Sequence, residues 1–372
     1  MTAPRVKAKT RIGVVFGGPS REHGVSFLSA RCLLENLPAG TYEPVPLFVG
    51  KDGLWHGPQA SKAEMERQFA RPPKDLLLDG LKPGSRPART SEIVDSFFSA
   101  WHAAGAQVLF PMVHGTFGED GVVQGLFESL GVPYVGCGVA ASAVGMDKVF
   151  MKAAFAAAGL PQVRYVAFSR GEWSAPATRA SLVTRIDGLG YPVFVKPSCA
   201  GSSVGVTKVK EEAGLAKAVE AALKIDARVL AEKGADAREI ECSVLEGENG
   251  GPTEASVPGE IVPGHEFYDY EDKYIDTGSR AIIPADLPAP AREEVRQLAT
   301  RAFDVISGAG FARVDFFLER RTQRILVNEI NSLPGFTPIS MFPKMWEASG
   351  LSLGRLLDRL VRSAFARPAR GR

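Results

Sequence analysis

Two consecutive segments near the end of the chain place charged and amide side chains between apolar residues. The apolar runs 311–318 and 325–330 flank the polar turn ERRTQR and predict a β-hairpin. Side chains alternate across a strand, so Arg313 and Asp315 share one face of the first strand. Folding the hairpin symmetrically about its turn brings Asp315 opposite the region of Glu329, within about one residue of register. The hairpin therefore gathers functional groups on one sheet face.

The second strand of this hairpin completes a set of oxygen donors. Glu329 and Asn331 are two residues apart, so the strand period places them on one face, together with Val327. Asp315, Glu329 and Asn331 are then three hard oxygen donors, and Mg²⁺ favours such donors with water and substrate phosphates completing its shell. A solvated face with a local ion pair is the alternative. The apolar neighbours on both strands favour the metal site.

A glycine- and serine-rich loop is the second candidate for chemistry. Residues 192–195 and 204–209 predict two strands joined by the loop KPSCAGSS, residues 196–203. Backbone amides and hydroxyls in such a loop can bind phosphate oxygens, and Lys196 at its entrance adds positive charge. The P-loop pattern GxxxxGK[ST] is absent, and a flexible hairpin loop is the alternative. The lysine at the end of an apolar strand favours phosphate binding.

The first part of the chain predicts an α/β unit. Residues 11–16 predict a buried strand, which the turn GGPS connects to a helix over 22–37, as in a doubly wound parallel sheet. The dinucleotide pattern GxGxxG is absent. Ser20 is a candidate cap, and a carboxylate at Glu22 suits the first helical turn, so the local pattern favours a capping role for Glu22.

Two more strands, 42–49 and 107–113, extend this sheet, and residues 56–91 are expected to form surface loops. His114 directly follows the strand 107–113. Ligands of open α/β sheets bind beyond the carboxyl ends of the strands, so His114 is placed for ligand contact. A structural role for a single loop histidine is the alternative, and the residues alone leave both open.

The remaining elements are expected around the hairpin. Strands are predicted at 238–245, with Glu239 and Glu241 on one face, and at 255–261 and 281–283; helices are predicted at 139–160, 290–308 and 351–366. The acidic, aromatic segment 264–280 has no helix or strand period and predicts a lid or binding loop around Lys273 and Tyr274. Packing of its tyrosines onto the body is the alternative. The turn 333–338 offers backbone amides to a bound phosphate.

Composition limits the class of protein. The 372 residues are 45% hydrophobic with a formal net charge of +2, which allows two or three domains and gives no sign of a nucleic-acid partner. No stretch reaches the roughly 20 apolar residues of a membrane span, and the apolar run after the basic N-terminus is too short for a signal peptide. The four cysteines are widely spaced and suggest reduced thiols. A cytoplasmic enzyme is expected, and a binding protein is the alternative.

Seven motifs stand in one order along nearly the whole chain: FGGPSREHGVS, HGTFGEDGVVQG, MDK, FVKPSCAGSSVGV, EFYDYEDKY, RVDFF and NEINSLPGFTPISM. In this order the sequence resembles the D-alanine–D-alanine ligases of the ATP-grasp superfamily. Gly24, Cys199 and residues 56–91 depart from the family pattern. The resemblance implies an α/β (α+β) fold of three domains, with a doubly wound N-terminal domain at 1–136 and two ATP-grasp subdomains, 137–232 and 233–372, that enclose ATP.

The resemblance also implies the reaction. ATP phosphorylates one D-alanine, and the amine of a second D-alanine displaces phosphate from the acyl phosphate. Arg313 and the Gly335 amide would stabilise developing charge, and Asp315, Glu329 and Asn331 would bind Mg²⁺ or Mn²⁺, two ions in all; a monovalent cation is a further candidate. The remaining nucleotide contacts implied by the family are Lys148, Lys196, Ser202, Ser203, Glu232, Lys233, Glu239 and Lys273.

For the amino acids, the resemblance replaces the capping role of Glu22 with binding of the first D-alanine's ammonium, with His114 nearby. Glu22, Ser202 and Tyr274 match a hydrogen-bonded set that connects the N-terminal domain to the lid. Ser340 and Met341 match the site of the second D-alanine's carboxylate, and a homodimer is the family expectation. A D-alanine–D-lactate ligase is an alternative that Tyr274 argues against; a non-catalytic nucleotide-binding protein would have lost Arg313 or a metal ligand.

Overall fold

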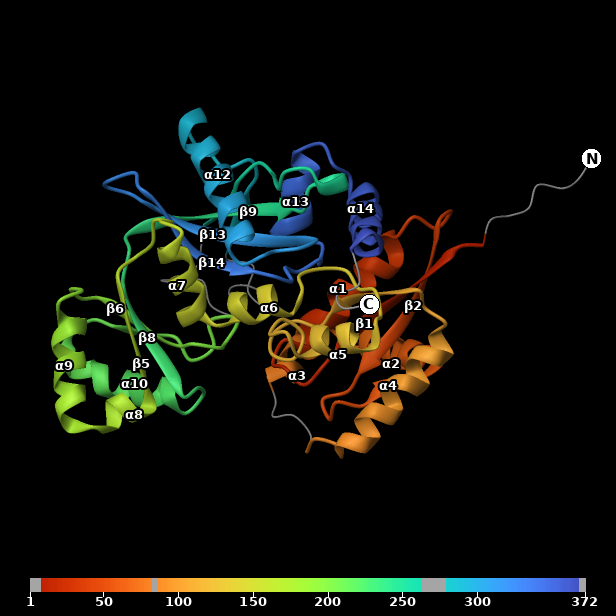
Figure 1. The fold of residues 1–372 in the computed structure, drawn as a ribbon, viewed down its shortest axis with the longest axis horizontal. Helices are drawn as coiled ribbons and strands as arrows, with labels where there is room; N and C mark the ends of the chain where they lie inside the picture. Colours follow the sequence, from red (N-terminus) through yellow and green to blue (C-terminus); the bar gives the residue numbers. More distant parts are fainter. Residues whose placement is uncertain (1–7, 82–85, 263–278, 368–372) are drawn as a thin grey trace, which may run out of the picture.

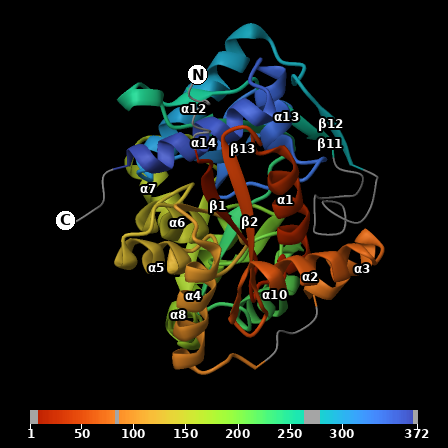
Figure 2. The same cartoon turned by 90° about the vertical axis from the view of Figure 1, so that its right-hand side faces the viewer.

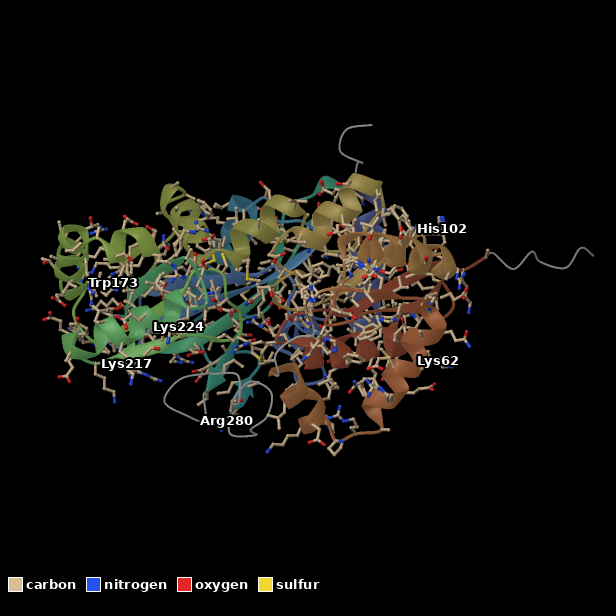
Figure 3. The ribbon with its side chains drawn as sticks, turned by 90° about the horizontal axis from the view of Figure 1, so that it is seen from below. Lys62, His102, Trp173, Lys217, Lys224 and Arg280 are labelled. Atoms are coloured by element: carbon tan, nitrogen blue, oxygen red, sulfur yellow. The ribbon has the colours of Figure 1, made fainter. Side chains whose placement is uncertain are left out.

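The computed structural model describes residues 8–81, 86–262 and 279–367. Its strands form separate sheets flanked by helices, which confirms the mixed α/β class (Figure 1). The molecule is elongated: Lys217 and Lys224 lie toward one end and Lys62 and His102 toward the other (Figure 3). The predicted site residues Lys273 and Tyr274 lie outside the described residues. No helix within the described ranges is long and apolar enough to cross a membrane.

The N-terminal sheet has the strand order β3-β2-β1-β4, in which β1 is parallel to β2 and to β4. Its two faces belong to different cores: Ile12 and Phe16 of β1 face one core, and Val15 faces the other. Helices therefore cover both faces, as the doubly wound pattern predicted. The elements are β1 (Thr10–Gly17), α1 (His23–Asn36), β2 (Tyr42–Val49), β3 (Trp55–His56), α2 (Pro58–Phe69), α3 (Pro73–Leu81), α4 (Thr90–Ala104), β4 (Val108–Met112) and α5 (Val122–Leu130).

The prediction of surface loops over residues 56–91 is wrong, because α2 and α3 lie there. Both helices begin at a proline, Pro58 and Pro73. Proline suits the first turn of a helix, where its missing N–H has no partner to lose, so a proline-rich segment can contain helix starts as well as loops. The buried side chains of Ser61 and Leu76 fix these helices to the body.

The central sheet has the strand order β5-β8-β6-β7, and all of its pairs are antiparallel. The segment 139–160, for which the sequence allowed one helix or a pair, forms a pair of helices that meet at Asp147. The predicted strand 204–209 is shorter than expected, since the loop continues to residue 206. The elements are α6 (Val139–Met146), α7 (Lys148–Ala157), β5 (Tyr165–Ser169), α8 (Arg170–Ser174), α9 (Pro176–Asp187), β6 (Val193–Pro197), β7 (Thr207–Val209), η1 (Glu212–Gly214), α10 (Leu215–Leu223) and β8 (Arg228–Lys233).

The third sheet has the order β12-β11-β9-β13-β14, with β10 paired to β9. The strand predicted over 255–261 is two short strands, β10 and β11. The elements are β9 (Ala237–Leu245), η2 (Glu248–Gly250), β10 (Glu254–Ala255), β11 (Gly259–Val262), β12 (Arg280–Ile282), α12 (Ala289–Val305), β13 (Phe311–Glu319), β14 (Ile325–Asn331), α13 (Met341–Ala348) and α14 (Leu353–Ala366).

A β-bulge changes the faces of β14. Asp315 pairs with Glu329, but Phe316 pairs with Val327, so Asn328 has no partner of its own in the register. The bulge turns Val327 into the core beside Ile330. The expectation that Val327 shares a face with Glu329 is therefore wrong, whereas the predicted pairing of Asp315 with Glu329 is confirmed.

The hydrophobic cores combine distant parts of the chain. Met151 and Phe155 of α7 pack in the core beneath β13 and β14. Leu357 of α14 packs in the core that also holds Ile12 and Phe16 of β1. Helix α14 accordingly lies against α1 of the N-terminal part, as both ribbon views show (Figures 1 and 2).

Candidate active site

The predicted metal-binding residues meet on β13 and β14. Asp315 lies opposite Glu329, and Arg313 lies opposite Asn331. The Arg313 guanidinium donates two hydrogen bonds to the Asp315 carboxylate, at 2.6 and 2.7 Å, and Asn331 Nδ2 donates to Asp315 Oδ2 at 3.1 Å. This orientation leaves the amide oxygen of Asn331 as an acceptor. The donors are two carboxylates and an amide, a set that suits a hard divalent cation.

Glu241 is a neighbour of this group that the sequence reasoning did not assign. It pairs with Asp315 from the other side, on β9, so that Glu241, Asp315 and Glu329 form a row across three strands. Its side chain is almost fully buried and lies 3.2 Å from Arg313 Nε. Within the described ranges, no three His, Cys, Asp or Glu side chains converge closely enough to hold a metal ion. A metal ion at this row would need a ligand of another type, and the Asn331 side chain lies beside Asp315 at 3.1 Å.

Lys148 joins the glycine-serine loop to this hairpin. It is the first residue of α7, and its Nζ donates to the Ala200 carbonyl at 2.8 Å. The same Nζ lies 3.7 Å from Glu329 Oε2. The Lys148 ammonium thus lies between the glycine-serine loop and the row of carboxylates. A positive charge at this position is well placed to hold an anion that contacts both.

Asp147 fixes the start of α7 and the base of the loop together. Its side chain accepts hydrogen bonds from the amides of Val149 and Phe150, which caps the helix, and from Ser198 Oγ at 2.6 Å. Arg228 forms an ion pair with it. Burial raises the pKa of Asp147, but these hydrogen bonds and the arginine charge outweigh it, and the pKa is lowered. Asp147 is the middle residue of the MDK motif, and the sequence alone did not predict a role for it.

The same aspartate suppresses the thiolate of Cys199 in the loop. Burial and the charge of Asp147 raise the pKa of Cys199 to about 12. The sulfur donates to Asp147 Oδ2 at 3.3 Å. The thiol stays protonated at neutral pH, which makes it a weak nucleophile.

Lys196 and Glu232 form a buried ion pair that includes a third residue. Lys196 Nζ donates to Glu232 Oε2 at 2.5 Å, and Lys152 Nζ lies 2.8 Å from Glu232 Oε1. Burial raises the pKa of Glu232, yet the two lysines outweigh it and lower the pKa to about 2. Burial lowers the pKa of Lys196, but the charge of Glu232, with smaller contributions from Glu329 and Glu239, raises it overall. Lys196 thus lies within electrostatic reach of the third sheet.

The other residues predicted to bind the nucleotide lie on different elements and have different surroundings. Lys233 Nζ donates to the carbonyl of Leu189 at 3.0 Å, at the end of β8. Glu239 lies opposite Phe317 in the sheet. Ser202 and Ser203 both have left-handed backbone angles, with φ of 48° and 58°. Such angles are uncommon outside glycine and concentrate at binding loops.

Glu22 connects the N-terminal part to the glycine-serine loop. It is the N-cap residue of α1, but its side chain makes no capping hydrogen bond, so the capping role is wrong. Its Oε1 accepts a hydrogen bond from Ser202 Oγ at 2.5 Å. The carboxylate lies between two glycines: a Cβ on Gly115 would meet Glu22 Oε2 at 2.6 Å, and one on Gly201 at 3.1 Å. A Cβ at Gly115 would therefore displace the Glu22 carboxylate, and one at Gly201 would only crowd it.

His114 is buried and holds the turn after β14. Its Nδ1 lies 3.2 Å from the Leu333 carbonyl, which can only accept, so Nδ1 carries the proton and Nε2 accepts from Ser29 Oγ at 2.9 Å. The Phe336 amide donates to the same Ser29 hydroxyl at 3.2 Å. Both ring nitrogens therefore have protein partners, and His114 fixes the position of the turn that contains Gly335.

Gly335, Ser340 and Met341 form one corner of this turn. A Cβ on Gly335 would lie 2.8 Å from Ser340 Oγ, which itself accepts from the Thr337 amide at 2.9 Å. Ser340 is the N-cap of α13. The side chain of Met341 is buried against Ile261, so any polar contact from Met341 must come from its backbone.

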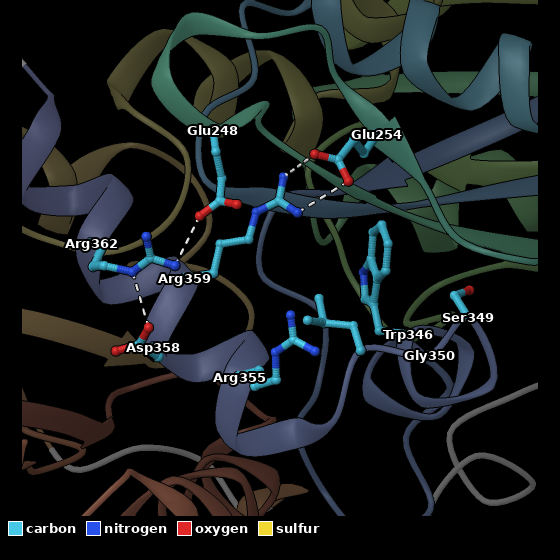
Figure 4. Close-up of a pocket in the computed structure, with 10 residues that line it drawn as sticks. Glu248, Glu254, Trp346, Ser349, Gly350, Arg355, Asp358, Arg359 and Arg362 are labelled. Atoms are coloured by element: carbon cyan, nitrogen blue, oxygen red, sulfur yellow. Dashed lines mark hydrogen bonds and ion pairs between the residues drawn. The ribbon is translucent and has the colours of Figure 1, made fainter. Parts of the chain in front are cut away.

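A pocket elsewhere contains none of the predicted residues. It has a volume of about 290 Å³ and lies between α14 and the end of α13, where Trp346 forms part of its wall (Figure 4). Its charges largely pair with one another, Arg359 with Glu254 at 2.6 Å and Arg362 with Glu248 at 2.8 Å. The predicted site residues therefore lie outside this pocket.

Comparison with known proteins gives consistent matches. Residues 11–137 match the family model for the D-ala D-ala ligase N-terminus, and residues 154–362 match that for the C-terminus. The chain is 42% identical to a D-alanine–D-alanine ligase of Acetivibrio thermocellus, with 96% of each chain covered. It is 44% identical to one of Streptomyces coelicolor, with 96% of this chain and 94% of the relative covered.

Solved structures agree with these sequence matches. The D-alanine-D-alanine ligase from Coxiella burnetii superposes with a TM-score of 0.77 at 36% identity, with 97% of this chain and 95% of that chain covered. The VanG D-Ala:D-Ser ligase from Enterococcus faecalis superposes with a TM-score of 0.74 at 28% identity, with 96% of this chain and 100% of that chain covered.

Proposed function

The chain belongs to the D-alanine–D-alanine ligase family, whose fold is the ATP-grasp fold, and we propose that it joins two D-alanines at the expense of ATP. A carboxylate oxygen of the first D-alanine attacks the γ-phosphorus, and the bond from that phosphorus to the bridging oxygen of ADP breaks. The amine of the second D-alanine then attacks the acyl carbon, loses a proton, and displaces phosphate. The product is the dipeptide that cell-wall synthesis consumes.

The observation that supports this proposal most directly is the position of Lys148. It contacts the glycine-serine loop through Ala200 and the carboxylate row through Glu329. Phosphoryl transfer depends chiefly on positioning and on stabilising charge, so a cation between these elements is what the reaction requires. We assign the nucleotide phosphates to Lys148, Lys196 and the loop amides, with Ser202 and Ser203 closing over them. Glu232, Lys233 and Glu239 are assigned to adenine and ribose; since lysines engage both Glu232 oxygens, its contact would come from the backbone.

The donor set of β13 and β14 fits a divalent cation. Asp315, Glu329 and Asn331 would hold Mg²⁺ or Mn²⁺, two ions in our proposal, which neutralise charge on the nucleotide phosphates when bound. The Arg313 guanidinium, held by Asp315 and Glu241, is positioned to stabilise the phosphoryl group in transfer. The Gly335 amide, together with Arg313, would stabilise the oxyanion that forms when the amine attacks the acyl carbon.

The two D-alanine substrates are assigned to residues other than those that hold the nucleotide. The Glu22 carboxylate would pair with the ammonium of the first D-alanine, and His114 would position the turn beside it rather than donate a proton. The N-terminus of α13, at Ser340 and Met341, suits the carboxylate of the second D-alanine, because helix N-termini attract anions. Lys273 and Tyr274, which lie outside the described residues, would complete the site if their segment is the lid that the family resemblance implies; closure of such a lid would protect an acyl phosphate from water.

Phosphate release and product mass test the proposal. Protein, ATP and Mg²⁺ are incubated with D-alanine, with L-alanine, or with D-alanine and D-lactate. We expect phosphate release that requires D-alanine and a product with the mass of its dipeptide. A depsipeptide as main product would favour the D-lactate ligase instead, and absence of D-alanine-dependent turnover with ADP still bound would leave only a nucleotide-binding protein.

An Asp315→Asn variant connects this activity to the carboxylate row. We expect phosphate release to fall at least about a hundredfold, because a lost ligand weakens the cation that balances phosphate charge. Asp95→Asn on the exposed face of α4 is the matched control and should keep full activity. Full activity in Asp315→Asn would remove the hairpin from the mechanism.

Three further features are proposed, and the first two have tests of their own. A homodimer would be seen by light scattering coupled to size exclusion, and activation by a monovalent cation by comparing potassium with sodium salts. A cytoplasmic location agrees with the free thiols of the four cysteines and with the use of ATP.

A further inference from the structure

Lys152 is a buried lysine that the proposed mechanism does not use. Its side chain is 1% exposed, and it lies on α7 one turn after Lys148. Its Nζ lies 2.8 Å from a Glu232 carboxylate oxygen and 5.4 Å from the centroid of the Tyr165 ring. An ammonium enclosed in this way loses its hydration, so its charge must serve to offset another charge.

The contact with Glu232 acts through charge more than through a directed hydrogen bond. Neither Lys152 Nζ nor Glu232 Oε1 has a well-oriented hydrogen bond within the part of the chain that the structure describes. By contrast, Lys196 donates a 2.5 Å hydrogen bond to the other oxygen of Glu232. The side chain of Lys196 is 14% exposed and is the only one of the three that reaches toward solvent, since Glu232 is 3% exposed.

These three side chains carry two positive charges and one negative charge. If Lys152 were absent, Glu232 would neutralise Lys196 completely, and a phosphate approaching Lys196 would meet an ion pair of zero net charge. With Lys152 present, one positive charge remains uncompensated inside the triad. The other carboxylates near Lys196 belong to the facing sheet: Glu329 lies 3.7 Å from Lys148, and Glu239 is assigned to ribose.

We infer that Lys152 is a positioning residue that offsets the charge of Glu232 and so keeps the positive charge of Lys196 available to the nucleotide phosphates. This inference rests on the proposed function, because it takes the nucleotide to bind at Lys196. Lys152 would then raise the affinity for the nucleotide phosphates without touching the nucleotide itself.

Binding of ADP and of adenosine by calorimetry separates this role from a structural one, because adenosine has the same base and ribose but no phosphate. We expect Lys152→Met to weaken ADP binding on the order of tenfold and to leave adenosine binding unchanged. The double variant Lys152→Met with Glu232→Gln restores the net positive charge and should recover ADP binding to within about threefold. Lys62→Met, at an exposed lysine on α2 that Figure 3 labels, is the matched control.

Each result decides the inference. Equal ADP binding in Lys152→Met, equal weakening of ADP and adenosine, or failure of the double variant to recover ADP binding overturns it. If Lys152→Met does not fold, Glu232→Gln alone decides, because it should raise the preference for ADP over adenosine, and a lowered preference overturns the inference. If the unaltered protein binds adenosine but not ADP, the proposed phosphate site fails instead.

Discussion

At the scale of single residues, Glu232 shows how charge is stabilised in this site. Two lysines lie within 3 Å of its carboxylate, and they lower its pKa from 4.5 to about 2 in spite of burial. A depressed carboxyl pKa means that the native state holds the ionised form more strongly than the unfolded chain does. The stabilisation is complete above the unfolded pKa and is lost as the pH falls from about 4.5 toward 2.

Glu232→Gln tests this linkage. The free energy of unfolding of the unaltered protein should exceed that of the variant at pH 7, by on the order of 3 kcal/mol, and the difference should shrink as the pH is lowered to 3. Urea denaturation followed by circular dichroism at each pH gives the difference. Glu347→Gln on the exposed end of α13 should show no such pH dependence. A difference that stays constant between pH 7 and pH 3 would contradict the ion-pair account.

At the scale of elements, two loops from different parts of the molecule enclose one carboxylate. Glu22 lies between Gly115, after β4, and Gly201, in the glycine-serine loop, with Ser202 donating to it at 2.5 Å. Gly115 also has a φ of 78°, which side chains rarely adopt. The position of Glu22 therefore depends mainly on the absence of a Cβ at Gly115.

Gly115→Ala should displace the Glu22 carboxylate and weaken its hydrogen bond with Ser202. We expect the KM for D-alanine to rise about tenfold or more. The Kd for ADP should rise much less, because Lys148 and Lys196 are held by α7 and β6, and Ser202 alone among the assigned phosphate contacts is bonded to Glu22. Steady-state kinetics and ADP calorimetry measure the two quantities. Gly125→Ala on α5 is the control, since a Cβ there meets nothing within 4 Å; it should leave KM unchanged and stabilise the helix by about 0.5–1 kcal/mol. An unchanged KM in Gly115→Ala would separate Glu22 from substrate binding.

The elements also show what the sequence could and could not predict. The hairpin and the pairing of Asp315 with Glu329 follow from apolar alternation and a polar turn, and both are confirmed. The bulge at Asn328 breaks the period of two that such reasoning assumes, so the face of Val327 was predicted wrongly. A bulge depends on how neighbouring strands fit, which a single strand's pattern does not contain.

Buried charges were the harder part to predict. Lys152 stands three residues before the buried Phe155 on α7, which was a signal that it faces inward. Its partner Glu232 lies eighty residues away in the sequence, on β8, and only the folded chain brings the two within 2.8 Å. Glu241 was hard to predict for the same reason, because only the pairing of β9 with β13 brings it beside Asp315.

At the scale of the whole molecule, the last helix completes the first domain's core. Leu357 of α14 is fully buried in the cluster that contains Ile12 and Phe16 of β1. Tyr42 Oη donates to Asp358 Oδ1 at 2.7 Å across 316 residues of sequence. Phe311 at the start of β13 is buried in the same cluster, so the N-terminal sheet and this end of the hairpin are parts of one packed body.

Leu357→Ala tests this joint packing. Truncation of a fully buried leucine leaves a cavity, and we expect the free energy of unfolding to fall by about 2–5 kcal/mol in a single cooperative transition. Urea denaturation monitored by circular dichroism and by tryptophan fluorescence should give coincident curves. Phe365→Ala, on the exposed face of the same helix, should change stability far less. Separate transitions for the two probes would mean that the N-terminal part unfolds on its own.

The dependence of β1 on α14 has a consequence for how the protein is made. Strand β1 is synthesised more than 300 residues before α14, so the core that α1, α3 and α14 share with β1 lacks its α14 side chains during the synthesis of the residues between them. Ile12, Phe16 and Phe27 then expose apolar surface to other nascent chains until residue 366 has emerged. A circular permutation that places α14 ahead of β1 would shorten this exposed interval, and we expect it to lower aggregation during synthesis.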